Sequence, residues 1–169
     1  MRIALDTIPR SGRVVGVDID AEWATTSVAE ALDATPSTLT GQIDIAQPVH
    51  KRVGVEVDVR VTAELACDRC AELTILEVHA SNQLQYKPLP SDVDDAELQA
   101  GDLDVGWYTD RALDLGDVLA EAVTLSIPAR ITCKDAESCE ARTNAMLAEQ
   151  RPTSDVGHPG FAALRTISE

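Results

Sequence analysis

Four cysteines are the residues of this chain whose type and spacing could do chemistry. Cys67 and Cys70 are separated by two residues, and Cys133 and Cys139 follow much later with five residues between them. Two thiolates at the first spacing can chelate one ion from a tight turn, and a second pair can complete a zinc tetrahedron with Zn–S bonds of about 2.3 Å. The four residues are therefore a candidate zinc site, in which the second pair has the looser spacing.

Two other interpretations of the thiols stay open. Thioredoxin-like redox chemistry needs the CxxC pair at the start of a helix, where the thiol pKa is lowered. Here the pair follows a predicted strand, and the neighbouring Asp68 disfavours a thiolate, although Arg69 opposes it. The third interpretation is that the cysteines are small, reduced, buried residues without a ligand. A disulfide framework is disfavoured for a chain that we expect in the cytosol.

No other residue pattern marks a catalytic site. The three histidines, His50, His79 and His158, lie outside any Ser/His/Asp or HExxH pattern, and we expect them at the surface. The chain has no Walker loop and no dinucleotide-binding glycine fingerprint. Trp107-Tyr108 could stack on bases, but acidic neighbours favour packing in the core instead. The sequence thus predicts a non-enzymatic protein, with a zinc- or thiol-dependent enzyme as the alternative.

The elements that would position the first cysteine pair are two long strands. From Val53 to Leu65, apolar and polar residues alternate with a period of two, which is typical of a half-buried strand. A second alternating strand is predicted from Thr74 to Tyr86. The short link makes an antiparallel hairpin, so the CxxC pair should lie at its turn.

The remaining elements give the fold class. Weaker strands are predicted over Arg13–Ile19 and Ser37–Ile45. Three helices are predicted: a short one after a capping box at Ser27, one from Asp114 to about Ile127, and a polar one over Asp135–Glu149. Phe161 and Leu164 should dock a last turn. We therefore expect an α+β fold, with a mostly antiparallel sheet or small barrel from the N-terminal half and C-terminal helices packed on it.

Charge restricts the partners. The chain has 169 residues with 29 acidic and 14 basic side chains, a net charge of −15, and 44% hydrophobic residues, which suits one domain over residues 1–169. Such a surface disfavours direct binding of nucleic acid through phosphates and suits a basic partner. An acidic surface that only keeps the protein soluble is the competing interpretation.

The acidic charge is concentrated in one stretch. Residues 91–121 hold ten acids against Arg111 alone, a net charge of −9. Two prolines at its start, Pro88 and Pro90, break regular structure, so we expect a mobile acidic connector at 87–104. No run approaches the roughly 20 apolar residues that span a bilayer, and the short apolar N-terminal run is no signal peptide. We therefore expect a cytoplasmic protein without a membrane partner.

The order of these features resembles the YceD family, the large ribosomal RNA subunit accumulation proteins. The resemblance is carried by the valine-rich strand entering Cys67-Asp68-Arg69-Cys70, the second strand, the acidic linker, the Leu113-Asp114-Leu115 helix start and Leu125-Ser126-Ile127-Pro128. Glu137-Ser138-Cys139-Glu140 and the closing residues 158–164 complete it. Many members carry Gly-Leu-Cys-Pro and Cys-Gly after the helix, where this chain has Lys134-Asp135-Ala136-Glu137-Ser138. This departure argues against a zinc site shared with those members, and most of all against Cys133 as a ligand.

The resemblance implies a non-enzymatic accessory role in the synthesis, processing or stability of large-subunit (23S) ribosomal RNA in bacteria and plastids. Because an acidic protein is repelled by RNA, we expect its direct partner to be a basic ribosomal protein or a pre-ribosomal particle. A general acidic adaptor is a further alternative. The candidate contacts are exposed acids on the long strand and in the acidic stretch: Glu56, Asp58, Glu64, Asp92, Asp94, Asp95, Asp102 and Asp104.

Overall fold

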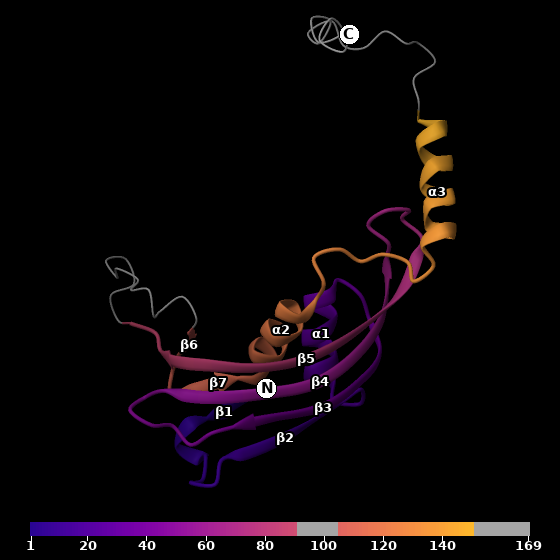
Figure 1. The fold of residues 1–169 in the computed structure, drawn as a ribbon. Coiled ribbons are helices and arrows are strands. Elements are labelled where there is room, and N and C mark those ends of the chain that lie inside the picture. The colour runs from indigo at the N-terminus through magenta and orange to yellow at the C-terminus, as the bar shows by residue number, and fades with distance from the viewer. Residues whose placement is uncertain (91–104, 151–169) are drawn as a thin grey trace, which may run out of the picture.

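The fold is a curved, mostly antiparallel sheet with two helices on one face and a third helix at one end (Figure 1). A computed structural model describes residues 1–90 and 105–150. The strands are β1 (Arg2–Ala4), β2 (Arg13–Asp18), β3 (Pro36–Ile45), β4 (Val53–Ala66), β5 (Leu73–Pro88), β6 (Gly106–Tyr108) and β7 (Ala112–Asp114). The helices are the 3-10 turn η1 (Leu5–Thr7), α1 (Glu22–Leu32), α2 (Leu115–Ser126) and α3 (Ala136–Glu149).

The β4–β5 hairpin is the centre of the sheet, and it confirms the predicted alternation. The odd-numbered positions of β4 from Val53 to Ala63 are buried, while Glu56, Asp58 and Glu64 on the opposite face are exposed. β4 and β5 pair without interruption from Val53↔Tyr86 to Ala66↔Leu73. The CxxC pair follows directly, so the hairpin places it at one end of the sheet.

The sheet is open, so the predicted alternative of a small barrel is wrong. The strand order is β2-β3-β4-β5-β6, and β2 and β6 are not paired with each other. Neighbouring strands are antiparallel except β5 and β6, which pair in parallel from Tyr86↔Gly106 to Pro88↔Tyr108. This pairing also corrects the start of the predicted connector, because Lys87 and Pro88 still belong to β5. Residues 91–104 of that connector lie outside the described residues.

Helices α1 and α2 cover the same face of the sheet and leave the other face open (Figure 1). On α2, Leu115, Val118, Leu119 and Ala122 follow helical spacing, and all four are completely buried. The Tyr86 hydroxyl of β5 donates to Glu121 Oε2 of α2 at 2.6 Å. Burial and this carboxylate both raise the pKa of Tyr86, so the phenol keeps its proton.

The helix ends confirm one predicted capping residue and contradict another. Asp114 Oδ1 accepts from Gly116 N at 2.9 Å, as predicted for the start of α2, and Pro128 follows its end. The predicted capping box at Ser27 is wrong, because α1 begins at Glu22 and Ser27 Oγ donates to the Trp23 carbonyl within the helix. Asp18 Oδ1 instead accepts from the Ala21 amide at 3.0 Å, just before the helix.

Three short strands, β1, β6 and β7, were not predicted. β1 and β7 form a separate two-stranded sheet, which joins the N-terminus to the start of α2. β6 contains the half-buried Trp107, with Lys87 Nζ 4.4 Å from its ring centroid, and Tyr108, which is buried in the core. Within the described residues, no helix is long and apolar enough to cross a membrane.

Candidate metal centre

The four cysteines, far apart in the sequence, meet at the end of the β4–β5 hairpin. Cys67 and Cys70 form the turn between the strands, Cys133 lies before α3, and Cys139 lies in its first turn. Cys67, Cys70 and Cys139 are buried and Cys133 is half-buried. They form a cluster of their own, separate from the main core.

The four sulfur atoms lie close enough together to share one metal ion. Sγ of Cys67 lies 3.7 Å from Sγ of Cys139, and Sγ of Cys70 lies 3.5 Å from that of Cys133. All four sulfurs lie within 4.8 Å of one another. A tetrahedron with Zn–S bonds of about 2.3 Å has S–S edges of about 3.8 Å, so the set fits a metal such as zinc.

The turn geometry explains how the hairpin presents two sulfurs together. The Cys67 amide donates to the Glu72 carbonyl at 2.8 Å, and the Ala71 amide donates to the Cys67 carbonyl at 2.9 Å. Ala71 has a positive φ of 58°, which turns the chain back into β5. The Arg69 amide points at Cys67 Sγ with a distance of 3.4 Å. Amide donors of this kind stabilise a thiolate.

The linker between α2 and α3 is held against this turn. The Asp68 amide donates to the Ile131 carbonyl at 2.8 Å, and the Ile131 amide donates to Asp68 Oδ2 at 2.6 Å. Lys134 Nζ lies 2.7 Å from Glu77 Oε1 of β5. Because the linker is fixed on both sides, Cys133 is carried to the hairpin although no regular element contains it.

Helix α3 brings the fourth sulfur and a cation. Asp135 caps the helix by accepting from the Glu137 and Ser138 amides at 3.1 and 3.4 Å, and the Ser138 hydroxyl also bonds to it. Arg142, one turn beyond Cys139, donates from Nη2 to Cys133 Sγ at 3.4 Å. Sequence reasoning missed Arg142, because nothing in its surroundings in the sequence marks it.

The thiols divide into two pairs by acidity. Amide hydrogen bonds, from Cys70 and then Arg69, lower the pKa of Cys67 to about 6, and the Glu72 amide lowers the pKa of Cys70. The hydrogen bond with Cys70 raises the pKa of Cys133 to about 12, and burial raises the pKa of Cys139. The hairpin thiols are therefore more acidic than the two thiols on the α3 side, and binding of a divalent cation would release the protons that remain.

The redox interpretation finds no support in this geometry. The CxxC pair lies in a turn between two strands and not at a helix N-terminus. Cys67 and Cys70 are each only 3% exposed, whereas a reactive thiol must be reached by its substrate. Neither His50 nor His79, the two histidines in the described residues, belongs to the cluster; His79 is exposed, with Nε2 2.9 Å from Asp58 Oδ1.

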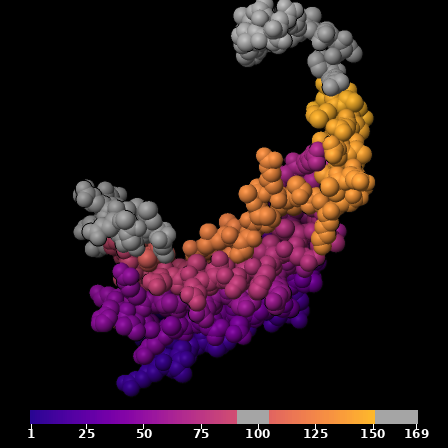
Figure 2. Space-filling view, viewed as in Figure 1, coloured from indigo at the N-terminus to yellow at the C-terminus, as the bar shows by residue number. Residues whose placement is uncertain are grey.

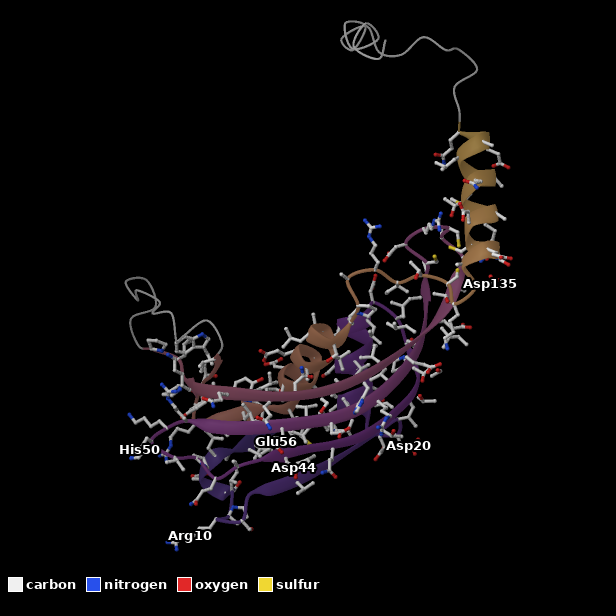
Figure 3. The ribbon with its side chains drawn as sticks, viewed as in Figure 1. Arg10, Asp20, Asp44, His50, Glu56 and Asp135 are labelled. Carbon is white, nitrogen blue, oxygen red and sulfur yellow. The ribbon has the colours of Figure 1, made fainter. Side chains whose placement is uncertain are left out.

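The acids predicted as partner contacts lie elsewhere. Glu56, Asp58 and Glu64 are exposed on the open face of the sheet, the face opposite the buried positions of β4. Figure 3 labels Glu56 and Asp44 on the sheet. Asp44 of β3 lies directly opposite Glu56 of β4 on that face. The other five predicted contacts, Asp92, Asp94, Asp95, Asp102 and Asp104, lie outside the described residues.

An α+β fold with an open sheet and a mostly buried cluster of four cysteines at its end defines a small protein with a candidate structural metal centre. The family model for the large ribosomal RNA subunit accumulation protein YceD matches residues 55–168, and the chain belongs to this family. Comparisons with curated proteins and with solved structures gave no significant match. Family membership implies a role in the accumulation of large-subunit ribosomal RNA.

Proposed function

We propose that the chain is a non-enzymatic, cytoplasmic accessory factor that supports large-subunit ribosomal RNA by binding a basic ribosomal protein. The observation that carries this proposal is the acidic open face of the sheet. Asp44 and Glu56 are opposed across β3 and β4, with Asp58 next on β4, although like charges directly opposite each other destabilise a sheet. A cationic partner would relieve this repulsion, since neither Asp44 nor Glu56 forms an ion pair within the described residues.

Neutral side chains on this face orient two of its carboxylates by hydrogen bonds. Gln83 Nε2 donates to Glu56 Oε1 at 2.9 Å, and Gln42 Nε2 donates to Asp44 Oδ2 at 2.8 Å. Amide donors orient a carboxylate without neutralising it, so its charge remains available to a partner. The same face continues through Glu64 toward the cysteine end.

A variant that tests this proposal replaces Glu56 by Gln, Asp58 by Asn and Glu64 by Gln. We expect its affinity for isolated basic large-subunit proteins to fall about ten-fold at low salt, because three exposed ion pairs are lost. Its thermal midpoint should not fall, since the repulsion with Asp44 is relieved. Titrations at low and moderate salt, combined with thermal melts, measure both quantities.

A matched control changes the same amount of charge elsewhere. Glu22 and Glu30 of α1 and Glu149 of α3 are exposed and lie off the open face. Their replacement by Gln should leave affinity within about two-fold. Equal loss in both variants, or wild-type affinity that does not fall with salt, would contradict binding through this face. Neutralising the acids between 92 and 104 tests the rest of the predicted contacts in the same titration.

We further infer that the four cysteines hold a structural zinc ion. A closed set of four thiolates leaves no coordination position for a substrate, which is the arrangement of structural and not catalytic zinc. When bound, zinc would supply the cross-link between the hairpin and α3. The residues around the sulfurs fit a thiolate site, because Arg142 and the Arg69 amide both donate toward sulfur.

Replacement of Arg142 by Gln tests the surroundings of this site. We expect zinc affinity to fall about ten-fold, because the guanidinium no longer offsets the negative thiolates. Competition with a chromogenic chelator measures the change. Arg130→Gln is the control, since Arg130 is exposed and forms no ion pair within the described residues. Identical affinities in the two variants would show that Arg142 does not contribute.

A further inference from the structure

Half of the basic side chains gather at one end of the sheet, which we call the cationic end. Its seven members come from six separate places in the sequence: Arg2, Arg10, Arg13, Lys51, Arg52, Lys87 and Arg111. The strand register places them together, since the β3–β4 turn, the start of β2 and the end of β5 lie at this end. Figure 3 shows Arg10 and His50 there, at the opposite end of the sheet from Asp135 and α3.

Two turns of the same unusual type form this end. Val49 pairs with Arg52 around His50 and Lys51, and both central residues have positive φ, 49° and 65°. Thr109 pairs with Ala112 around Asp110 and Arg111, again with positive φ, 53° and 54°. Such two-residue turns favour Asn and Gly, because other residues are strained there. In each turn this chain places a cation at the second, strained position.

The two turns are fixed relative to each other and face one cavity. The buried Tyr108 donates from its hydroxyl to the Lys51 carbonyl at 2.9 Å, and the Leu5 amide donates to the Arg111 carbonyl at 2.9 Å. A cavity of about 660 Å³ lies between them. It is lined by Leu5, Asp6, Ile8, Gln47, Pro48, Lys51, Tyr108 and Arg111. Strain retained next to a cavity is typical of binding sites.

Five of the seven cations of this end have no side-chain partner within the described residues, whereas Arg2 pairs with Asp110 and Lys87 lies over the Trp107 ring. Within the described part of the chain, the side chains of Lys51, Arg111, Arg10, Arg13 and Arg52 form no hydrogen bond or ion pair, and all five are exposed. At the cysteine end, by contrast, Arg69 pairs with Glu140 and Lys134 with Glu77. The chain has 29 acidic and 14 basic side chains, so there are enough acids to pair with every cation. The unpaired cations are therefore a local feature of this end, and they are available to bind a ligand of opposite charge.

The net charge does not prevent an anion from binding here. Charges separated by more than about 8 Å are largely screened at physiological salt. Glu56, the first acid of β4, lies three residues from Val53 at this end, roughly 10 Å at 3.3 Å per residue, and the acids farther along the strand lie still farther away. The local density of cations therefore decides binding at this end, and Asp6 is the one acid among the residues that line the described cavity.

We propose that the cationic end binds the phosphodiester backbone of single-stranded RNA. Lys51 and Arg111 take one phosphate at the cavity, and Arg10, Arg13 and Arg52 take its neighbours. The guanidinium groups offer paired donors to phosphate oxygens, and Lys51 offers a point charge. This site is separate from the acidic open face, so a factor of the YceD family would contact RNA at one surface and a basic protein at another.

The test uses the full chain and a labelled single-stranded RNA of about 16 nucleotides, followed by fluorescence anisotropy at 50 and 200 mM salt. The variant Lys51→Asn with Arg111→Asn removes both charges, while Asn suits the left-handed turn positions better than the native residues. We expect RNA affinity to fall about ten-fold at low salt. The slope of log K against log salt should fall by about 1.4. The thermal midpoint should stay the same or rise, which separates charge from folding.

The control is Arg60→Gln with Arg130→Gln, which removes two exposed cations away from this end. It should bind RNA within about two-fold of the wild type. Three results would overturn the proposal: no binding by the wild type at 50 mM salt, equal loss in variant and control, or equally tight binding of a poly-glutamate peptide. The Glu56, Asp58 and Glu64 variant should bind RNA at least as well as the wild type. The two proposals can therefore fail independently.

Discussion

Replacing Cys67 by serine should release the metal and detach α3 while the sheet stays folded. Cys139 is the only described residue of α3 that is buried, and Met146 and Leu147 are exposed, so the helix has no apolar face on the main core. Figure 2 shows α3 extending away from the body of the protein. An isolated helix of about 12–15 residues is marginal in water, so the cysteine cluster must supply its stability.

The size of this effect follows from coupling between metal and fold. Structural zinc contributes about 10–16 kcal/mol in small zinc-binding units at neutral pH, and the loss of one thiolate removes most of it. The main core contains none of the cysteines, so its packing is not directly affected. Elemental analysis should give about one zinc per wild-type chain and none in Cys67→Ser. Hydrogen exchange should speed up in α3 but not in β4.

Ala66→Ser is the matched control, because it adds the same hydroxyl to an exposed neighbouring position and keeps all four thiols. Chelation of the wild type should reproduce the Cys67→Ser exchange pattern. A wild type without zinc whose α3 is still protected would favour inert buried thiols. Cys133→Ser decides the fourth ligand, since unchanged zinc affinity in that variant would remove Cys133 from the site.

The sequence predicted what depends on regular repetition. The alternation from Val53 to Leu65 identifies β4 because a period of two must bury one face, and Asp114 identifies the start of α2 because its carboxylate is a local cap. Ser27 misled because a serine inside a helix can donate to the carbonyl four residues back, as it does to Trp23. A short strand such as β6 has no period to detect.

The cysteine cluster and the cationic end depend on tertiary contacts that the spacing of residues in the sequence does not reveal. The cysteine types suggested a metal, but tertiary contacts of the linker, Asp68 with Ile131 and Lys134 with Glu77, bring Cys133 to the hairpin. The cationic end was hidden for the same reason, since Arg10, Lys51 and Arg111 are far apart in the sequence and the net charge of −15 averages over them. Charge totals describe long-range steering, while the fold decides where unlike charges gather.

Replacing Gly41 by alanine should produce the largest loss of stability in the sheet. Gly41 lies in β3 opposite Val59 and has a φ of +152°, which L side chains rarely adopt. A Cβ at this position would lie 2.1 Å from the Asp58 carbonyl oxygen and 2.6 Å from Val59 Cα. Both are backbone or backbone-bonded atoms of the central strand, so no flexible side chain can move aside.

The cost combines backbone strain with overpacking, each about 1–3 kcal/mol, so we expect about 3 kcal/mol or more in the free energy of unfolding. For a chain of this size this lowers the thermal midpoint by about 6–12 °C. Gly16→Ala is the control: Gly16 lies in the edge strand β2 opposite Gln42, and nothing lies within 4 Å of an added Cβ. Its midpoint should stay within about 2 °C of the wild type. Equal midpoints for the two variants would mean that β3 and β4 can separate at Gly41, and the acidic face built on those strands would then be less rigid than the described register implies.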